Sequence, residues 1–447
     1  MPMQQIFLGS GGASGDSYWI LDIEPDSMVE YVAVMDVGVD SDGNVYVGST
    51  GNNIDGSGYK GGLVTKIDKE GTVLWQKTQH NSDNPELQCL GVSDDGSLIV
   101  YGAQYAEGPL NLGLNTSGVK QFAKHSGTHA SDKFFGLAFF PGTTDYLVEG
   151  KDDSEEAWFW QKCNSSGTRQ WITGYKCYPP TGTWYIQSLS KAKPFIDSSG
   201  NIYSIIVSRD SSFMNCVVKL NSSGVVQEDF EYNAGTSEDN FINCVVDSSD
   251  NIYIAARHRE NASSGEVRAS IIKTDSSGDI LWQREMYDAS ESIYPMQVIL
   301  DAAENPIMRL EDRTTDSNGE KAVGLVKWNS SGTLQWNRRL SAPTHESLSN
   351  QGKLIATPND NILMTWTVVD GGDRRQVIAQ LPADGTGTGT YGIFKYGAGT
   401  CTVDSYSGWV KQSGTHSTDT PALGTPTTSA TMTETSYPGD SNFNSIE

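Results

Sequence analysis

Two kinds of polar turn alternate along the chain, and this repetition constrains the fold more than any other feature. The first kind joins two apolar runs, as in DSSGNIYS around Gly200. The second ends in an aromatic residue, as in NSSGTLQW, where Gly332 stands four residues before Trp336. Each kind occurs seven times, at intervals of about 50 residues. Self-similarity at this period is the sequence signature of solenoids and propellers.

The two series predict tight hairpins joined by strands. Asp, Asn, Ser and Gly at the turn centres supply the side-chain-to-backbone hydrogen bonds and the positive φ that such hairpins need. Between turns, apolar and polar residues alternate, as in ASIIKTD followed by DILWQREM, which is the period-two pattern of half-buried strands. The first series is centred on Gly43, Gly96, Thr144, Gly200, Asp250, Glu304 and Asp360, and the second on Gly71, Gly118, Gly167, Gly224, Gly278, Gly332 and Gly385.

Each repeat is therefore expected to form four antiparallel strands, and seven such units predict an all-β, seven-bladed β-propeller. A linear stack of seven sheets would leave apolar end faces, which a ring covers. We interpret the recurring aromatic residue as a structural wedge on the outer strand, packing on its own and the neighbouring sheet. Burying one such ring removes roughly 150–250 Å² from water, and truncating it to Ala costs about 3–5 kcal/mol. These aromatic residues are Trp75, Phe122, Trp171, Trp282 and Trp336.

The seventh repeat lacks its aromatic residue, because Gly389 stands four residues after Gly385. The missing pattern occurs at the other end of the chain, where Gly15 and Trp19 have the same spacing. We therefore predict that the strand at 17–24 is the outermost strand of blade seven and closes the ring by main-chain pairing.

The segments on either side of the repeats differ in composition. The propeller is predicted to span residues 15–398, preceded by a short docking arm at 1–14. Residues 399–447 are rich in Thr, Ser, Gly and Pro, with little apolar periodicity. Such a segment cannot bury enough apolar surface to fold alone, so we expect an extended C-terminal arm that becomes ordered only against a partner.

Charge and cysteine content exclude several classes of protein. The net charge is −24 and the pI is about 4.5, which disfavours nucleic acid and anionic membrane surfaces as partners. The start MPMQQIFLGSGG has no basic residue and a single short apolar run, so it predicts neither a secretory signal nor a membrane insertion. Six cysteines are too few for a disulfide scaffold, and we expect free thiols.

Four short motifs suggest chemistry, but a simpler interpretation fits each. GSGYKG at 56–61 matches a nucleotide-binding fingerprint, but no helix is expected after it. His125 and His129 have ligand-like spacing without a third ligand, which favours an inter-blade linker. DDSEE at 152–156 is expected to be a solvated loop, and DSDGN at 40–44 a hairpin turn rather than a calcium loop.

The remaining residues offer no catalytic constellation. WFW at 158–160 places Trp158 and Trp160 on one strand face, where inter-blade packing is expected and a sugar-stacking platform is the alternative. No G-x-S-x-G, H-E-x-x-H or P-loop motif occurs. Predicted innermost strands such as 134–140 and 296–301 are mainly aliphatic, small and aromatic. We therefore predict no catalytic residue, no metal and no cofactor.

The units D-S-S-G-N-I-Y and K-x-N/D-S-S-G-x-x-x-W resemble bacterial seven-bladed propeller repeats, which are related to quinoprotein-type repeats. Quinoprotein dehydrogenases would add a usually eight-bladed ring and a pocket with paired cysteines, which this sequence does not match. The MQQIFLG start and the Thr/Ser-rich end also resemble propeller-containing virion proteins of tailed bacteriophages from marine and cyanobacterial hosts.

The leading hypothesis is a non-enzymatic structural component of a phage tail or capsid, made in the host cytoplasm and located in the virion. Its terminal arms would contact other virion proteins, and the ring could contact host surface glycans. The alternative is a cell-surface or periplasmic propeller that binds carbohydrate or acts as an adhesin.

Overall fold

The tight turns occur where the sequence predicts them, and their geometry explains their composition. In the turn at 40–44, the amide of Gly43 donates to the carbonyl of Asp40 over 3.0 Å, and Gly43 has a φ of 83°. DSDGN is therefore a hairpin turn, as predicted. In the corresponding turn of blade three, the residue with positive φ is Gly142, slightly before the predicted centre at Thr144. Three turns place a residue with a side chain in this left-handed region: Asp250, Glu304 and Asp360.

The structure is a computed structural model, and it describes most of the repeat region. The described residues are 3–10, 17–23, 31–52, 60–80, 86–104, 109–125, 133–152, 157–178, 185–186, 193–209, 213–236, 239–261, 265–288, 292–312, 322–341, 347–348, 352–370, 373–391, 394–412, 417–419 and 443–445.

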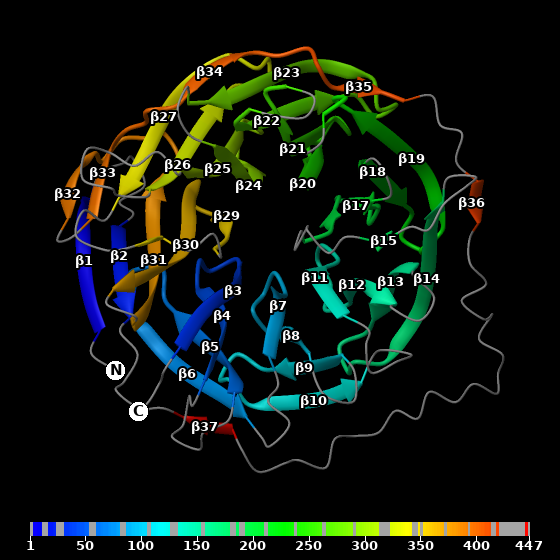
Figure 1. The fold of residues 1–447 in the computed structure, drawn as a ribbon. Coiled ribbons are helices and arrows are strands. Elements are labelled where there is room, and N and C mark those ends of the chain that lie inside the picture. Colours follow the sequence, from blue (N-terminus) through cyan, green and yellow to red (C-terminus); the bar gives the residue numbers. More distant parts are fainter. Residues whose placement is uncertain are drawn as a thin grey trace.

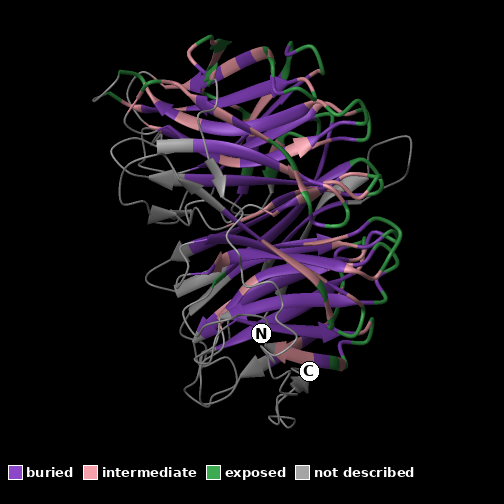
Figure 2. Ribbon diagram, turned by 90° about the vertical axis from the view of Figure 1, so that its right-hand side faces the viewer, coloured by how far each residue is buried: buried purple, intermediate pink, exposed green. Residues whose placement is uncertain are grey.

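Seven sheets follow one another around a central axis, which confirms the predicted all-β, seven-bladed β-propeller (Figure 1). Within the ranges just given, every regular element is a strand. No helix long and apolar enough to cross a membrane is present in that part of the chain. Viewed from the side, the strands are mostly buried and the exposed residues gather at the tight turns (Figure 2).

The first three blades each contain four antiparallel strands. Blade one consists of β3 (Tyr31–Val39), β4 (Val45–Asn52), β5 (Lys60–Ile67) and β6 (Val73–His80). Blade two consists of β7 (Glu86–Val92), β8 (Ile99–Gln104), β9 (Leu110–Leu114) and β10 (Lys120–His125). Blade three consists of β11 (Lys133–Phe139), β12 (Tyr146–Asp152), β13 (Ala157–Cys163) and β14 (Arg169–Tyr178).

Blade four differs slightly at its inner edge, where two short strands replace one. It consists of β15 (Tyr185–Ile186), β16 (Phe195–Ile196), β17 (Ile202–Arg209), β18 (Phe213–Leu220) and β19 (Val226–Asn233), and both short strands pair with β17. Blade five consists of β20 (Asn240–Val246), β21 (Ile252–Arg259), β22 (Val267–Thr274) and β23 (Ile280–Tyr287). Blade six consists of β24 (Ile293–Leu300), β25 (Pro306–Asp312), β26 (Ala322–Trp328) and β27 (Leu334–Ser341).

Blade seven joins the two ends of the repeat region. Its inner strands are β28 (Ser347–Leu348), β29 (Leu354–Ala356), β30 (Asn361–Asp370) and β31 (Asp373–Pro382). The N-terminal strand β2 (Ser17–Ile23) pairs antiparallel with β31, so Trp19 lies opposite Gln380 and the predicted closure is confirmed. One detail of that prediction is wrong. Strand β1 (Met3–Ser10) pairs with β2 and adds a fifth strand outside it, so β2 is not the outermost strand.

Apolar side chains between neighbouring blades form the core. Seven hydrophobic clusters correspond to the seven blade-to-blade interfaces. Cys89, Cys163, Cys216 and Cys244 are buried, and none of these four residues forms a disulfide. Because an apolar cluster fills each interface between two twisted sheets, each blade is stabilised mainly by its neighbours.

Candidate functional site

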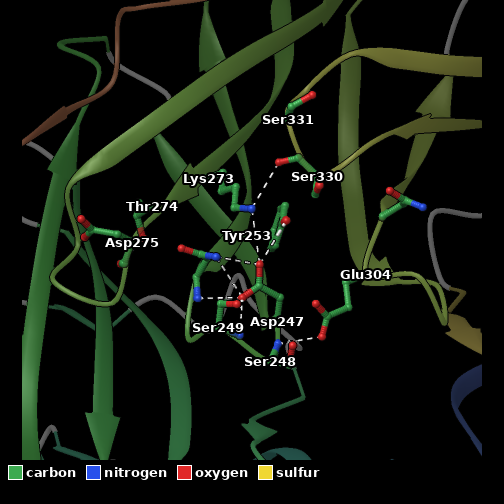
Figure 3. Close-up of polar contacts among 12 residues, drawn as sticks. Asp247, Ser248, Ser249, Tyr253, Lys273, Thr274, Asp275, Glu304, Ser330 and Ser331 are labelled. Carbon is green, nitrogen blue, oxygen red and sulfur yellow. Dashed lines mark hydrogen bonds and ion pairs between the residues drawn. The ribbon is translucent and has the colours of Figure 1, made fainter.

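The first tight turn of blade five is a polar cluster (Figure 3). The carboxylate of Asp247 accepts hydrogen bonds from the amides of Ser249 and Asn251 at 3.0 and 2.9 Å. It also accepts the Tyr253 hydroxyl at 3.3 Å and pairs with the Lys273 ammonium at 3.4 Å. Burial alone would raise the pKa of this carboxyl, but the hydrogen bonds and the Lys273 charge outweigh burial, so the pKa is lowered.

In blades five and six, the lysine and the tryptophan of the repeat converge on one carbonyl of the next blade. The ammonium of Lys273 and the indole N–H of Trp282 both donate to the carbonyl of Ser330, at 3.2 and 3.1 Å. This shared acceptor explains the spacing of Lys and Trp in the K-x-D-S-S-G-x-x-x-W pattern. The turn between them must bring both side chains to the same carbonyl at the boundary with the next blade. The arrangement recurs one blade later, with Lys327, Trp336 and Ala383.

The turn glycines have a second role besides positive φ. Gly332 has a φ of 79°, and a Cβ there would lie 2.8 Å from the Trp282 ring of the preceding blade. Gly385 has the same relation to Trp336, also at 2.8 Å. Because each glycine has no side chain, the aromatic ring of the preceding blade can pack directly on its backbone. The ring that packs there is not the tryptophan that follows the glycine in its own strand.

The predicted repeat residues take up the following positions. The indole N–H groups of Trp19 and Trp75 donate to Lys69 and Thr116 of the next blade, each over 3.0 Å. Phe122 and Trp171 pack against the next turn glycine, which is Gly167 for Phe122 and Gly224 for Trp171. Gly71 and Gly118 have positive φ, and Gly15 lies outside the described residues.

Blade four uses a different pair of aromatic residues, which the sequence comparison missed. Phe230 packs where a Cβ on Gly278 would lie, and the Tyr232 hydroxyl donates to the Gly278 carbonyl at 2.7 Å. The signal was present in VVQEDFEYN, but at a spacing of six and eight residues from Gly224 rather than four.

Charged residues also connect the blades near the central axis. Asp36 on β3 is 1% exposed, and its carboxylate accepts the Leu90 amide of blade two at 2.8 Å. Lys193, just before β16 in blade four, pairs with Asp36 at 3.2 Å and donates to the Val37 carbonyl at 2.6 Å. Because blades one and four are not neighbours, this side chain reaches across the channel.

The sequence analysis also missed two buried ionisable residues on second strands. Glu149 is 1% exposed and accepts the Ser204 hydroxyl of blade four at 2.6 Å. Burial raises the pKa of its carboxyl to about 8. Arg309 is equally buried, donates to the Gly352 carbonyl at 2.6 Å, and has a pKa lowered by burial to about 10. Both side chains thus link a blade to the next one.

The other sequence motifs are accounted for as follows. Trp158 and Trp160 are fully buried between blades three and four, so inter-blade packing is confirmed and they form no exposed sugar platform. Most of GSGYKG, His129 and most of DDSEE lie outside the described residues. Within the described ranges, no three His, Cys, Asp or Glu side chains form a group that could hold a metal ion.

The C-terminal segment forms a second layer of strands around the ring. After β32 (Gly389–Tyr391), five strands add in turn to the outer edges of blades six, five, four, three and one (Figure 1). They are β33 (Phe394–Ala398), β34 (Thr402–Ser405), β35 (Val410–Lys411), β36 (Ser417–Asp419) and β37 (Phe443–Ser445). We call residues 394–412 the belt. Residues 399–412 of the belt belong to the predicted C-terminal arm, and they are ordered against the ring itself.

The belt covers main-chain groups that would otherwise be free. An open outer strand presents unpaired N–H and C=O groups and can template pairing with other chains. Strands β33, β34 and β35 occupy such edges on β27, β23 and β19. The belt also supplies side chains to the core, because Phe394, Tyr396 and Trp409 are each 1% exposed.

A buried polar cluster lies beneath the belt in blade five. The Nδ1 of His258 is 2.8 Å from the Ser270 hydroxyl, and its Nε2 is 3.4 Å from Glu285. The Tyr406 ring of the belt stacks on the imidazole with ring centres 4.3 Å apart. Burial, assisted by the charge of Arg268, lowers the pKa of His258 to about 4, so the imidazole is neutral at pH 7.

No protein-family model matches the chain, and no curated protein matches it. Solved structures similar to it include the β-propeller domain of the trilobed protease from Pyrococcus furiosus, with 9% identity, a TM-score of 0.49 and coverage of 79% of this chain and 94% of that one. The WD40 domain from Toxoplasma gondii coronin has 8% identity, a TM-score of 0.49 and coverage of 85% and 86%. The dihydro-heme d1 dehydrogenase NirN has 12% identity, a TM-score of 0.46 and coverage of 81% and 73%. At these identities the likeness is one of fold alone.

Proposed function

We propose that the protein is a non-enzymatic structural protein whose ring serves as a rigid module of a larger particle. The observation that supports this proposal is the double closure of the ring. Strand β2 completes blade seven by pairing with β31, and the belt joins the outer edges of blades six, five and four. These two sets of pairings stabilise the closed ring against opening of its blades. Neither of them builds a reactive centre.

The polar groups support the same role. The carboxylates of Asp36 and Glu149 and the ammonium groups of Lys193, Lys273 and Lys327 all bind groups of other blades. Catalytic groups need to face a substrate, whereas these groups are used to connect sheets.

We propose more specifically that the particle is the virion of a tailed bacteriophage, in which the ring is attached to the tail or capsid. The resemblance of the MQQIFLG start and the Thr/Ser-rich end to phage propeller proteins supports this choice. Other virion proteins would be bound through the terminal segments, and the ring could also contact host surface glycans.

Purified particles provide the test. We expect peptides of this protein in the mass spectrum of density-purified virions and gold-labelled antibody at a fixed place on them. Detection in the cell envelope but not in virions would overturn the phage assignment. A glycan array with the same protein would then test the carbohydrate-binding alternative, and a stoichiometric transition metal in elemental analysis would count against the non-enzymatic role.

A further inference from the structure

One titratable side chain of blade five lies directly under the belt. The imidazole of His258 is 2% exposed, and the Tyr406 ring stacks on it with an angle of 19° between the two planes. The Trp409 ring stands edge-on to the same imidazole, with the ring centres 6.4 Å apart. A histidine takes up a proton near pH 6.5 when water surrounds it. Two aromatic side chains of the belt therefore cover a group that would carry a charge in mildly acidic water.

Trp409 fixes the belt above this histidine. Its ring occupies a socket between blades four and five, with its centre 5.2 Å from that of the Phe241 ring. The amide N–H of Trp409 donates to the Gln283 side-chain oxygen at 3.1 Å, and the Gln283 side-chain nitrogen donates to the Trp409 carbonyl at 2.9 Å. The amide N–H of Tyr406 donates to the Gln283 carbonyl at 3.3 Å. The socket and these three bonds hold the Tyr406 ring on the imidazole.

The charged groups around His258 come mostly from blade five itself. Glu285 on β23 lies 3.4 Å from the Nε2 atom of His258, and one guanidinium nitrogen of Arg268 on β22 donates to both Glu285 oxygens at 3.2 Å. The titratable groups around the stacked rings, from β22, β23, the residues that flank β20 and β21, and the belt, are Arg268, Glu285, Asp239, Glu260, Tyr406 and Asp404. Only the last two belong to the belt.

The groups that the belt adds decide how protonation and docking are coupled. The blade-five charges stay in place whether or not the belt is docked, so they act on the pKa of His258 in both states. The belt adds two aromatic rings, and its carboxylate, Asp404, accepts the Tyr287 hydroxyl at 2.8 Å. A tyrosine face attracts a cation, but the removal of water from a charged imidazole costs more. Burial is accordingly the largest cause of the lowered pKa of His258, which is about 4.

Separation of this part of the belt from blade five would be local. Strands β34 and β35 pair over only four and two residues, and Val403 packs on the cluster between blades five and six. The chain on both sides is attached to the same ring, through β33 on blade six and β36 on blade three. Opening of residues 402–412 therefore leaves the ring closed and exposes the edges of β23 and β19.

We propose that residues 402–412 are an acid-sensitive strap, which stays docked on blades four and five while His258 is neutral and separates from them when the imidazole takes up a proton. The coupling is reciprocal, because docking that disfavours a proton is weakened by a proton to the same extent. Docking is at full strength above pH 6.5, and it weakens as the pH falls toward 4. In acid the strap frees two strand edges that are paired at neutral pH.

Hydrogen exchange of the full-length protein, corrected for the intrinsic effect of pH on exchange, tests the release. Protection of the amides of residues 402–412 should fall at least about tenfold between about pH 7 and pH 4.5, relative to β33, which is held on blade six by the same kind of pairing. In His258→Gln, which keeps a polar side chain that does not titrate, this difference should disappear. The variant retains the contact of Lys411 with Asp279 at 3.0 Å, so an acid effect on this surface pair appears in both proteins.

An NMR titration of His258 measures the same coupling from the other side. The pKa of His258 should be about 4 in the native protein and should rise toward 6.5 in Tyr406→Ala, because water then reaches the imidazole. Tyr406→Phe, which keeps the stacked ring, should leave this pKa low.

Three results would overturn the proposal. The first is a loss of protection in acid that is equal in the native protein and in His258→Gln. The second is a pKa of His258 that does not change in Tyr406→Ala. The third is tighter docking of residues 402–412 in acid. None of these readouts depends on the protein being found in a virion.

Discussion

Replacing Trp19 by Ala should open the ring at its closing blade. The side chain is fully buried, and its indole N–H donates to the Lys69 carbonyl of blade one over 3.0 Å. Loss of roughly 150–250 Å² of buried aromatic surface at about 25 cal/mol per Å² corresponds to about 4–6 kcal/mol. Measured truncations of this kind cost about 3–5 kcal/mol, and the lost hydrogen bond adds about 1 kcal/mol. We expect the free energy of unfolding to fall by about 4–5 kcal/mol.

Trp75 is the matched control for this experiment. It occupies the same repeat position and makes a bond of the same length to Thr116, but its side chain is only partly buried. Trp75→Ala should therefore cost about 2 kcal/mol, and Trp19→Phe, which keeps most of the ring, about 1–2 kcal/mol.

Urea titrations followed by circular dichroism give the three free energies, because this signal does not depend on the mutated tryptophan. Hydrogen exchange of the β2 and β31 amides locates the effect, since Trp19→Ala should speed exchange there more than Trp19→Phe or Trp75→Ala does. If Trp19→Ala lowers the free energy of unfolding no more than Trp75→Ala does, the buried closing strand does not stabilise the ring by the amount expected from its burial.

Three further predictions concern backbone strain and buried ionisable groups. Asp250→Gly should stabilise the ring by about 1 kcal/mol, because glycine adopts the positive φ of this position without steric strain. Glu304→Gly should not stabilise the ring, because it also removes the carboxylate that accepts the Ser248 amide at 2.8 Å. Equal urea midpoints for the two variants would contradict this prediction. The pKa of His258 falls from 6.5 to about 4 on folding, so its contribution is complete above pH 6.5 and is lost as the pH falls to 4, by up to about 3 kcal/mol. The stability of His258→Phe should depend less on pH in this window, and parallel pH curves would argue against it. Burial raises the pKa of Glu149 from 4.5 to about 8, so the contribution of this group to stability is complete below pH 4.5 and is lost as the pH rises to 8, by up to about 5 kcal/mol. Glu149→Gln should therefore be more stable than the native protein above pH 8. If the variant and the native protein unfold at the same alkaline pH, the raised pKa of Glu149 is refuted.

The repeat and its closure were predictable because their causes are local. Asp, Asn and Gly at fixed places determine a tight turn through bonds within five residues, as the Asp247 turn illustrates. The alternating strands between turns then determine four-stranded sheets of one size. Trp19 could be assigned to blade seven because its spacing from Gly15 matched a position that the seventh repeat lacks.

Only the tertiary structure decided which groups meet across blades. Nothing in the sequence relates Lys193 to Asp36, because their contact depends on the diameter of the ring and the order of its blades. Likewise, the repeat pattern predicts Trp282 but not its acceptor, Ser330, which lies in the next repeat.

The belt shows most clearly where sequence patterns stop being informative. Its strands bind blade edges through main-chain groups, which every residue carries, and most side chains of β34 and β35 face solvent. No alternation of apolar and polar residues is needed, so the composition is the same as that of an unfolded tail. The one side chain with a specific place, Trp409, has no counterpart at a repeat position. Its socket exists only after blades four and five have packed together.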